Sequence, residues 1–305
     1  MSMQPATNDV LEKARPYMDI ALKRAKKLPL FTQAITAVMV LFFLLSFVSG
    51  INDAFMLYPS AIIPDWELSR LTTYPLVHLS FLHLLLNVIA FVPLAARFEL
   101  RFGTLRTLAM LLGPFESVPG LLYCFFEGTI LRSEPGLAGA SGFVFTLLAI
   151  ESMVSRQESW TIAGRSIPAW TAPIVALFVS LLLLPGSSFL GHLFAMATGY
   201  VFGSGHVDFL LLPSWVVDFV EHRGKFLFDK LPNYVTAERA AESSLGHGGL
   251  PTTEHPLSNS AGLASPGLGH RLGGRNEADS DDEEIGARLP GADKRPGSSR
   301  RVTGA

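Results

Sequence analysis

A serine lies between two glycines inside a long apolar stretch of the chain. The stretch covers residues 137–150 and reads LAGASGFVFTLLAI, with Ser141 between Gly139 and Gly142. A glycine destabilises a helix by about 1 kcal/mol relative to alanine, so a segment that only crossed a membrane would gain nothing from these two. A serine becomes a nucleophile when a nearby imidazole accepts its proton. Ser141 is therefore a candidate nucleophile if a histidine lies at the same depth.

Three more polar side chains lie in two other apolar stretches. His192 lies near the start of GHLFAMATGYVFG, residues 191–203, and His83 and Asn87 lie in HLSFLHLLLN. Residues four apart share one face of a helix, and polar side chains inside a membrane are candidates for function because they are costly there. An imidazole at His192 could take the proton of a serine. His83, Asn87 and the backbone N–H of the serine could donate to the oxyanion that forms next.

Six apolar segments must position these side chains. The chain of 305 residues is 49% hydrophobic and only 16% charged, whereas a soluble domain carries about a quarter charged residues. A run of about 20 apolar residues matches the hydrocarbon core of a bilayer. The sequence therefore predicts an all-α membrane protein, a bundle of six transmembrane helices followed by a disordered C-terminal tail. The predicted spans are 30–50, 74–95, 105–126, 136–154, 169–185 and 187–204.

The basic residues predict the orientation of this bundle. Six lysines and arginines precede the first span, and the turns at 97–106 and 155–168 carry five arginines. The alternate loops carry only Arg70 and Arg132. By the positive-inside rule, both termini are cytosolic.

With this orientation, the polar side chains fall in one layer. The second, fourth and sixth spans start on the non-cytosolic side, so Ser141, His192 and His83 lie ~8 Å below that face and Asn87 ~14 Å, at 1.5 Å per residue. Small residues such as Gly199 in the sixth span let helices approach closely. No free carboxylate lies at this depth. The pattern therefore predicts a Ser–His dyad with oxyanion donors rather than a full triad.

No metal, cofactor or nucleic acid is predicted as a partner. The His-Glu-x-x-His pattern of metalloproteases is absent, and neither a cysteine nor a carboxylate lies in the polar layer, so a zinc site is not expected. Cys124 is the only cysteine, which excludes a disulfide within the chain. The net charge of −2 gives no sign of a nucleic-acid partner.

The chain divides into four predicted segments. Residues 1–29 form a cytosolic N-terminal segment, 30–205 the six-span domain, 206–236 an interfacial amphipathic segment and 237–305 a disordered cytosolic tail. The last segment is rich in glycine, serine, proline and charge. Such a composition cannot bury enough apolar surface to offset the entropy lost on ordering.

The same residues make the chain similar to the rhomboid intramembrane serine proteases. The GASG of 139–142 resembles the family's G-x-S-G, the HLSFLHLLLN of 78–87 its H-x4-H-x3-N signature, and the FELRFG of 98–103 its E-x-R-x-G turn. The resemblance covers about residues 30–205. It implies a six-span fold that hydrolyses a peptide bond in or near the transmembrane segment of another membrane protein, with the lipid bilayer as its surroundings.

The resemblance also implies a role for each matching residue. Ser141 is the expected nucleophile and His192 the expected base, while His83 and Asn87 are expected to form the oxyanion hole. The supporting positions of the motifs are Gly139, Gly142, His78, Phe145 and Gly199.

Three positions depart from the family's pattern. Ala195 replaces a common glycine, Phe145 stands where many members have a tyrosine stacked on the catalytic histidine, and Ser69–Arg70 keeps only the arginine of a Trp–Arg pair. None of these changes removes a reacting group, so an active enzyme is expected. The six-span plan, the DKLPNYV of 229–235 and the long tail resemble fungal-type Golgi rhomboids, which implies a Golgi membrane.

A second short motif lies in the tail. The SPGLGHRLGG of 265–274 resembles the SHP box, a peptide that binds the AAA+ segregase which extracts membrane proteins. Gly267, Gly269 and Leu272 match that motif, with Arg271 before the leucine, but a serine takes its aromatic position. Glycine-rich tails often contain G-x-G, so segregase binding and an ordinary solvated tail both stay open.

Two other classes of function stay open beside the protease. One is a catalytically weak rhomboid-like protein that binds membrane clients and passes them to an AAA+ segregase. Such relatives usually lack the serine or the histidine, and this chain has both. The other is a small transporter that uses the polar layer as a pathway, for which inverted repeats would be expected. The sequence contains no internal repeat, and the protease is the favoured hypothesis.

Overall fold

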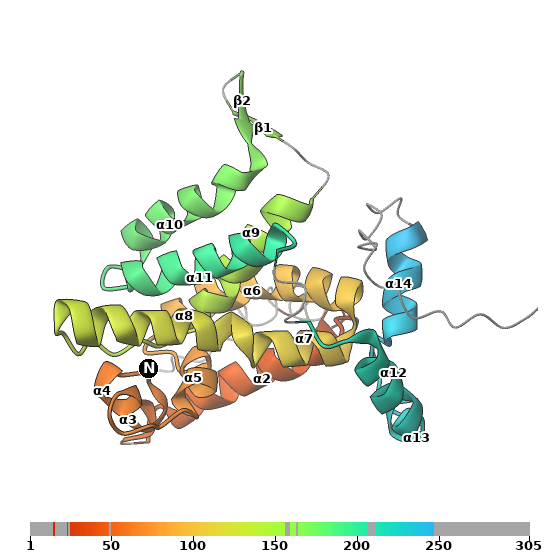
Figure 1. Cartoon of the computed structure of the whole chain (residues 1–305), viewed down its shortest axis with the longest axis horizontal. Helices are drawn as coiled ribbons and strands as arrows, with labels where there is room; N and C mark the ends of the chain where they lie inside the picture. Colours follow the sequence, from red (N-terminus) through yellow and green to blue (C-terminus); the bar gives the residue numbers. More distant parts are fainter. Residues whose placement is uncertain are drawn as a thin grey trace, which may run out of the picture. The chain divides into compact units, whose positions relative to one another are not determined.

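The described part of the chain is mostly helical (Figure 1). The computed structural model describes residues 15, 23, 25–48, 50–155, 159–162, 164–206 and 211–246. The contacts divide the chain into two units, Met1–Thr253 and Glu254–Ala305, and every described residue lies in the first. The elements are, in order, α2 (Leu30–Leu45), α3 (Ile51–Phe55), α4 (Pro59–Ile62), α5 (Arg70–Thr73), η1 (Tyr74–Leu76), α6 (Phe81–Phe102), α7 (Thr104–Leu111), α8 (Pro114–Cys124), η2 (Phe125–Leu131), α9 (Ser141–Val154), β1 (Ser159–Ile162), β2 (Arg165–Pro168), η3 (Ala169–Thr171), α10 (Ala172–Leu183), α11 (Phe189–Gly203), α12 (Ser214–Arg223), α13 (Lys225–Phe228) and α14 (Ala237–Gly246).

Six apolar helices make up most of this part. Within the described residues, two of them are long and apolar enough to cross a membrane by length and composition, Phe81–Phe102 and Thr104–Leu131. The four shorter ones are Leu30–Leu45, Ser141–Val154, Ala169–Leu183 and Phe189–Gly203.

The outer surface of these helices carries many large apolar side chains. Leu182 is 80% exposed, Phe178 64% and Ile89 62%. Exposed apolar surface on this scale marks contact with a membrane or a partner, and it agrees with a chain that lies in lipid.

Helices α9 and α11 lie side by side (Figure 1) and pack closely. Gly199 permits this, because a Cβ atom added there would lie 2.7 Å from the Cβ of Ala149. The Thr146 hydroxyl donates to the Ala195 carbonyl across the same contact, at 3.0 Å. Small residues are what let helix backbones approach in lipid, and here they bring the middle of α9 against the middle and second half of α11.

The start of α2 is held by Glu99, a buried residue of α6. Its carboxylate accepts hydrogen bonds from the backbone N–H groups of Phe31 and Thr32, each at 2.8 Å, and from the Thr104 hydroxyl at 2.7 Å. Charge-assisted bonds of this kind satisfy the free donors at a helix N-terminus and complement its dipole. One carboxylate thus ties α2, α6 and α7 together.

The segment after α13 is also bonded to these helix starts. The N–H of Leu30 donates to the Asn233 carbonyl at 3.0 Å, and Thr104 exchanges two bonds with Val235, N–H to carbonyl at 2.8 Å and N–H to hydroxyl at 2.9 Å. We call residues 233–236 the C-terminal latch. It satisfies donors at the start of α2 and α7 that have no partner within their own helices.

The prediction that the fold is all-α is wrong for one short segment. Residues 159–162 and 165–168 form an antiparallel hairpin, β1–β2, with Ile162 paired to Arg165. Gly164 has φ +76°, a conformation that tight hairpin turns need. The sequence indicates only a turn at 155–168, because each strand is too short to be recognised by its pattern.

The prediction of disorder from residue 237 is wrong for the first residues of that segment. Helix α14 (Ala237–Gly246) follows the C-terminal latch and packs against α6, with Ala240 buried. The Glu221 carboxylate accepts from the N–H of Ala237 at 3.1 Å and caps the start of the helix. The prediction used the average composition of the whole tail, whereas its first residues are rich in alanine and glutamate, which favour a helix.

Two helices that carry polar side chains begin later than predicted. The second span was predicted from residue 74, but α6 begins at Phe81, after the 3₁₀ turn η1 and with Ser80 as its N-cap. The fourth was predicted from residue 136, but α9 begins at Ser141, because Gly139 has φ +109° and cannot continue a right-handed helix. Ser141, His83 and His192 therefore lie in the first turns of their helices, and Asn87 lies in the second turn of α6.

Candidate active site

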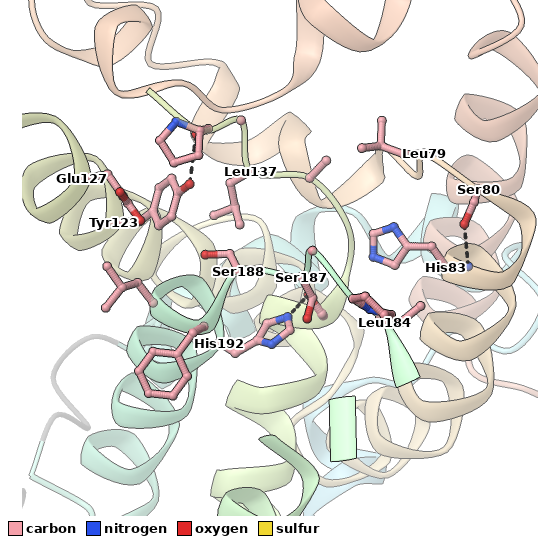
Figure 2. Close-up of a pocket in the computed structure, with 18 residues that line it drawn as sticks. Leu79, Ser80, His83, Tyr123, Glu127, Leu137, Leu184, Ser187, Ser188 and His192 are labelled. Atoms are coloured by element: carbon pink, nitrogen blue, oxygen red, sulfur yellow. Dashed lines mark hydrogen bonds between the residues drawn. The ribbon is translucent and has the colours of Figure 1, made fainter. Parts of the chain in front are cut away.

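Ser141 and His192 meet at the N-terminal ends of α9 and α11. Ser141 is the first residue of α9, and His192 lies in the first turn of α11. The Ser141 Oγ lies 2.8 Å from His192 Nε2, the contact drawn as a dashed line from His192 in Figure 2. At this distance the hydroxyl can donate to a neutral imidazole and then lose its proton to it. The structure thus brings together the two residues predicted as nucleophile and base.

The His192 ring is held from two sides. The ring of Phe145 lies against it, with centroids 4.5 Å apart and planes 31° apart, so the phenylalanine stacks without needing the family's tyrosine hydroxyl. On the other nitrogen, Ser180 Oγ lies 3.4 Å from His192 Nδ1. The Ser180 hydroxyl donates to the Leu177 carbonyl at 2.8 Å. Its oxygen therefore accepts from Nδ1–H, which leaves Nε2 free to accept from the serine.

Sequence reasoning missed Ser180. It lies in α10, in an apolar run that matches none of the motifs. The only signal for it was a single hydroxyl inside that run, and such hydroxyls commonly bond to their own helix.

His83 lies against the backbone just before the nucleophile. A Cβ atom added to Gly139 would lie 2.5 Å from His83 Cε1 and 2.6 Å from its Nε2. Gly139 is therefore required both by its positive φ and by the imidazole beside it. This arrangement leaves the His83 ring next to the start of α9, where the oxyanion of an attacked carbonyl would form.

Asn87 lies one turn further along α6 and is buried. Its side-chain N–H donates to the His83 carbonyl at 2.9 Å, and its Nδ2 would lie 3.7 Å from a Cβ on Gly139. Asn87 therefore lies in the same cluster as His83, behind it rather than at the cavity surface.

His78 precedes α6 and holds the loop that leads to the nucleophile. Its Nδ1 lies 3.1 Å from the Leu76 carbonyl, and its Nε2 accepts the N–H of Ala140 at 3.3 Å. These two contacts fit the tautomer with hydrogen on Nδ1. A buried imidazole thus fixes the residue next to Ser141 and does not enter the chemistry itself.

Gly142 lies against a buried carboxylate. A Cβ atom there would lie 2.8 Å from Glu116 Oε2, and Glu116 accepts a hydrogen bond from the Tyr74 hydroxyl. The Glu116 carboxyl group thus lies against the first turn of α9. Its partner is Tyr74, whereas His192 contacts Ser141 and Ser180, so Glu116 does not take the third position of a triad.

A cavity of about 380 Å³ lies at the dyad. Ser141, His192 and His83 line it, together with Tyr123 and Glu127 and the segments 135–138 and 184–190 (Figure 2). The other predicted site residues lie outside its lining: Asn87, Gly139, Gly142, His78, Phe145 and Gly199. Among the residues that the structure describes, no group of three or more histidine, cysteine, aspartate or glutamate side chains could hold a metal. The predicted segregase-binding residues, Gly267, Gly269, Arg271 and Leu272, lie outside the described residues.

Comparison with known proteins identifies the fold that carries this site. The family model of the Rhomboid domain matches residues 65–208. A Rhomboid-type serine protease 2 from Neurospora crassa is 39% identical over 256 residues, which cover 81% of this chain and 91% of the relative. The chain belongs to the rhomboid family. A second such protease, from Gibberella zeae, is 39% identical over 81% of this chain and 93% of its own length. One from Saccharomyces cerevisiae is 36% identical over 59% of this chain and 70% of its own length.

Membership of the rhomboid family settles several predictions. The family resemblance and the enzyme class, a rhomboid-type serine protease, are confirmed. Rhomboid proteins are integral membrane proteins that act on transmembrane substrates within the bilayer, so that class of partner applies to this chain as well.

Proposed function

We propose that this rhomboid protein hydrolyses a peptide bond in or next to a transmembrane segment with a Ser141–His192 dyad. The observation that carries the proposal is the 2.8 Å contact between Ser141 Oγ and His192 Nε2. Ser141 attacks the carbonyl carbon while Nε2 takes the hydroxyl proton, and His192 then returns that proton to the leaving amine. Water, deprotonated by the same imidazole, releases the acyl group from the serine.

The oxyanion is stabilised by donors at the start of α9. Ser141 is the first residue of that helix, so its backbone N–H has no acceptor within the helix and lies at the positive end of the dipole. His83, next to Gly139, is the side-chain donor. Asn87 donates to the backbone carbonyl of His83, and its side-chain amide lies behind the imidazole, where it can act as a further donor.

The proposed arrangement in the membrane has six spans within residues 30–205 and both termini in the cytosol. It is supported by the six apolar helices and by the arginines between spans. Residues 1–29 and the tail are then cytosolic, residues 206–236 lie at the membrane surface, and the site opens toward the non-cytosolic side. We place the protein in the Golgi membrane on its similarity to fungal-type Golgi rhomboids.

The direct test is cleavage of a rhomboid-cleavable transmembrane substrate by the purified full chain in liposomes. Ser141→Ala removes the nucleophile and is expected to reduce cleavage to background, while its thermal unfolding stays close to that of the wild type. Ser152→Ala is the matched control, since that hydroxyl lies on the same helix and donates to the Ala149 carbonyl. Cleavage by Ser141→Ala would refute the assignment of the nucleophile.

Recruitment of an AAA+ segregase through residues 265–274 stays a prediction. A synthetic peptide of this segment should bind the purified segregase, and a peptide with Leu272 and Arg271 replaced by alanine should not. If both peptides bind equally well, or if neither binds, the prediction is refuted. The alternative function as a weak client-binding protein has no observation in its favour.

A further inference from the structure

One end of the active-site cavity is formed by the end of the helix Thr104–Leu131. There α8 passes into η2, a stretch of π-helix that contains Glu127, and both Tyr123 and Glu127 line the cavity. Single π-helical turns are rare and occur frequently at functional sites. In the view of Figure 2, Tyr123 and Glu127 lie on one side of His192, and His83 lies on the other. A peptide bound over the dyad with the carbonyl of its scissile bond toward His83 therefore has the side chains on its opposite side toward Glu127.

Glu127 gives this end of the cavity a negative charge. It is the only acidic residue among those that line the cavity, and none of the lining residues is a lysine or an arginine. The Ser133 hydroxyl donates to its Oε2 and fixes the carboxylate. Within the described part of the chain, no lysine, arginine or histidine forms an ion pair with Glu127. The carboxylate is thus held in place without a cation of the protein.

The two hydroxyls nearest this end of the cavity direct their hydrogens to partners within the protein. The Tyr123 hydroxyl donates to the Pro135 carbonyl at 2.9 Å. The Ser188 hydroxyl accepts the N–H of Gly191 at the start of α11 and is hydrogen-bonded to Tyr123. Neither hydroxyl therefore offers a free donor to a bound substrate. An ammonium or guanidinium group carries only donors and therefore complements this end of the cavity, whereas a carboxylate would be repelled.

We infer that Glu127 makes this protease select substrates with a lysine or arginine side chain close to the bond that is cut. The inference rests on the proposed function, because the cavity selects substrates only if the dyad cuts them. A fixed charge in a partly water-excluded site discriminates both by attraction to the basic side chain and by repulsion of an acidic one. Basic residues are scarce on the non-cytosolic flanks of membrane helices. Such a requirement would thus separate a few substrates from most membrane proteins.

The test is a set of otherwise identical transmembrane substrates that carry lysine, glutamine or glutamate at one position near the scissile bond, repeated for each position on either side. The wild-type full chain, purified into liposomes, is expected to cut the lysine substrate roughly tenfold faster in kcat/KM than the glutamine one at the selective position. Glutamate at that position should slow the reaction by a similar factor. Both ratios should shrink as salt is raised.

Variants of Glu127 separate charge from structure. Glu127→Gln keeps the size of the side chain and an acceptor for Ser133, and it is expected to cut the lysine and glutamine substrates at equal rates. Glu127→Lys should reverse the preference and favour glutamate. Glu134→Gln is the matched control, because that carboxylate lies outside the cavity lining and accepts the N–H of Ser60; it should keep the wild-type ratios.

Two results would overturn the inference, and they differ from a failure of the proposed function. Equal cleavage of all the substrates by the wild type, or a lysine preference that survives in Glu127→Gln, would remove the role of Glu127 and leave the protease intact. No cleavage of any substrate by the wild type would remove the proposed function together with the inference.

Discussion

At the scale of single residues, the proposed base His192 contacts a hydroxyl from another helix. Ser180 accepts from His192 Nδ1–H, so Ser180→Ala should lower kcat while KM stays unchanged. The expected loss is roughly fivefold to tenfold, the effect of one hydrogen bond of about 1 kcal/mol on a transition state. Steady-state cleavage of a transmembrane substrate measures both constants.

The conservative variant distinguishes orientation from packing at this position. Ser180→Thr keeps a hydroxyl on the same carbon and should restore most of kcat, whereas a purely structural role would make both variants equally poor or equally good. Ser204→Ala, which removes a hydroxyl bonded only near the end of α11, should behave as the wild type.

In the proposed mechanism His83 and Asn87 act on the same oxyanion, so they should not behave as independent residues. His83→Ala and Asn87→Ala are each expected to lower kcat by about 10²–10³-fold, the usual loss for one oxyanion donor. Because both side chains lie next to Gly139 and would serve one oxyanion, the double variant should lose much less than the product of the two factors. Single-turnover rates of all three proteins test this, and full additivity would argue against a shared site.

At the scale of elements, the C-terminal latch makes residues beyond the spans part of the folded core. A chain that ends after Lys230 loses the bonds from Leu30 and Thr104 to the latch together with helix α14. We expect it to lose about 2–4 kcal/mol of stability, since several backbone donors at buried helix starts lose their partners. A lower Tm in detergent would report this loss.

The residue at which the shortened chain ends, rather than the shortening itself, should determine its Tm. A chain that ends after Gly246 keeps the latch and α14, and its Tm and cleavage rate should match those of the full chain. Equal Tm values for the two shortened chains would show that the latch contributes nothing.

The sequence predicted the family and many of the residues that meet, because their signals are local. The spacing of His83 and Asn87 on one helical turn and the small residues around Ser141 can be read from short stretches. The residue at which each helix begins could not be predicted in this way, since the start of α9 depends on the positive φ of Gly139 beside the His83 ring. Ser180 and Glu127 reach the site only through the packing of α10 and the turn into η2. No periodicity or motif in their own segments indicates that approach.

At the scale of the whole molecule, the polar groups form two separate clusters, one at each end of the helices. The dyad and Glu127 lie at the end where α9 and α11 begin, whereas Glu99, the latch and the hairpin β1–β2 lie where α6 and α9 end. In the proposed orientation, the site lies at the non-cytosolic face and the hydrogen-bonded framework at the cytosolic face. This orientation rests on the arginines between the spans and can be measured directly.

Ala54, in α3, and Ser166, in β2, should lie on opposite sides of the membrane, because three proposed spans separate them and both side chains are exposed. Cys124 is the only native cysteine, so Cys124→Ala gives a background for labelling. In sealed vesicles with the cytosolic face outward, an impermeant maleimide should label Ser166→Cys at once and Ala54→Cys only after the membrane is opened. Labelling of both cysteines before opening would put an even number of spans between the two positions and refute the six-span arrangement. Labelling of Ala54→Cys before opening and of Ser166→Cys only afterwards would keep the number of spans and invert the bundle.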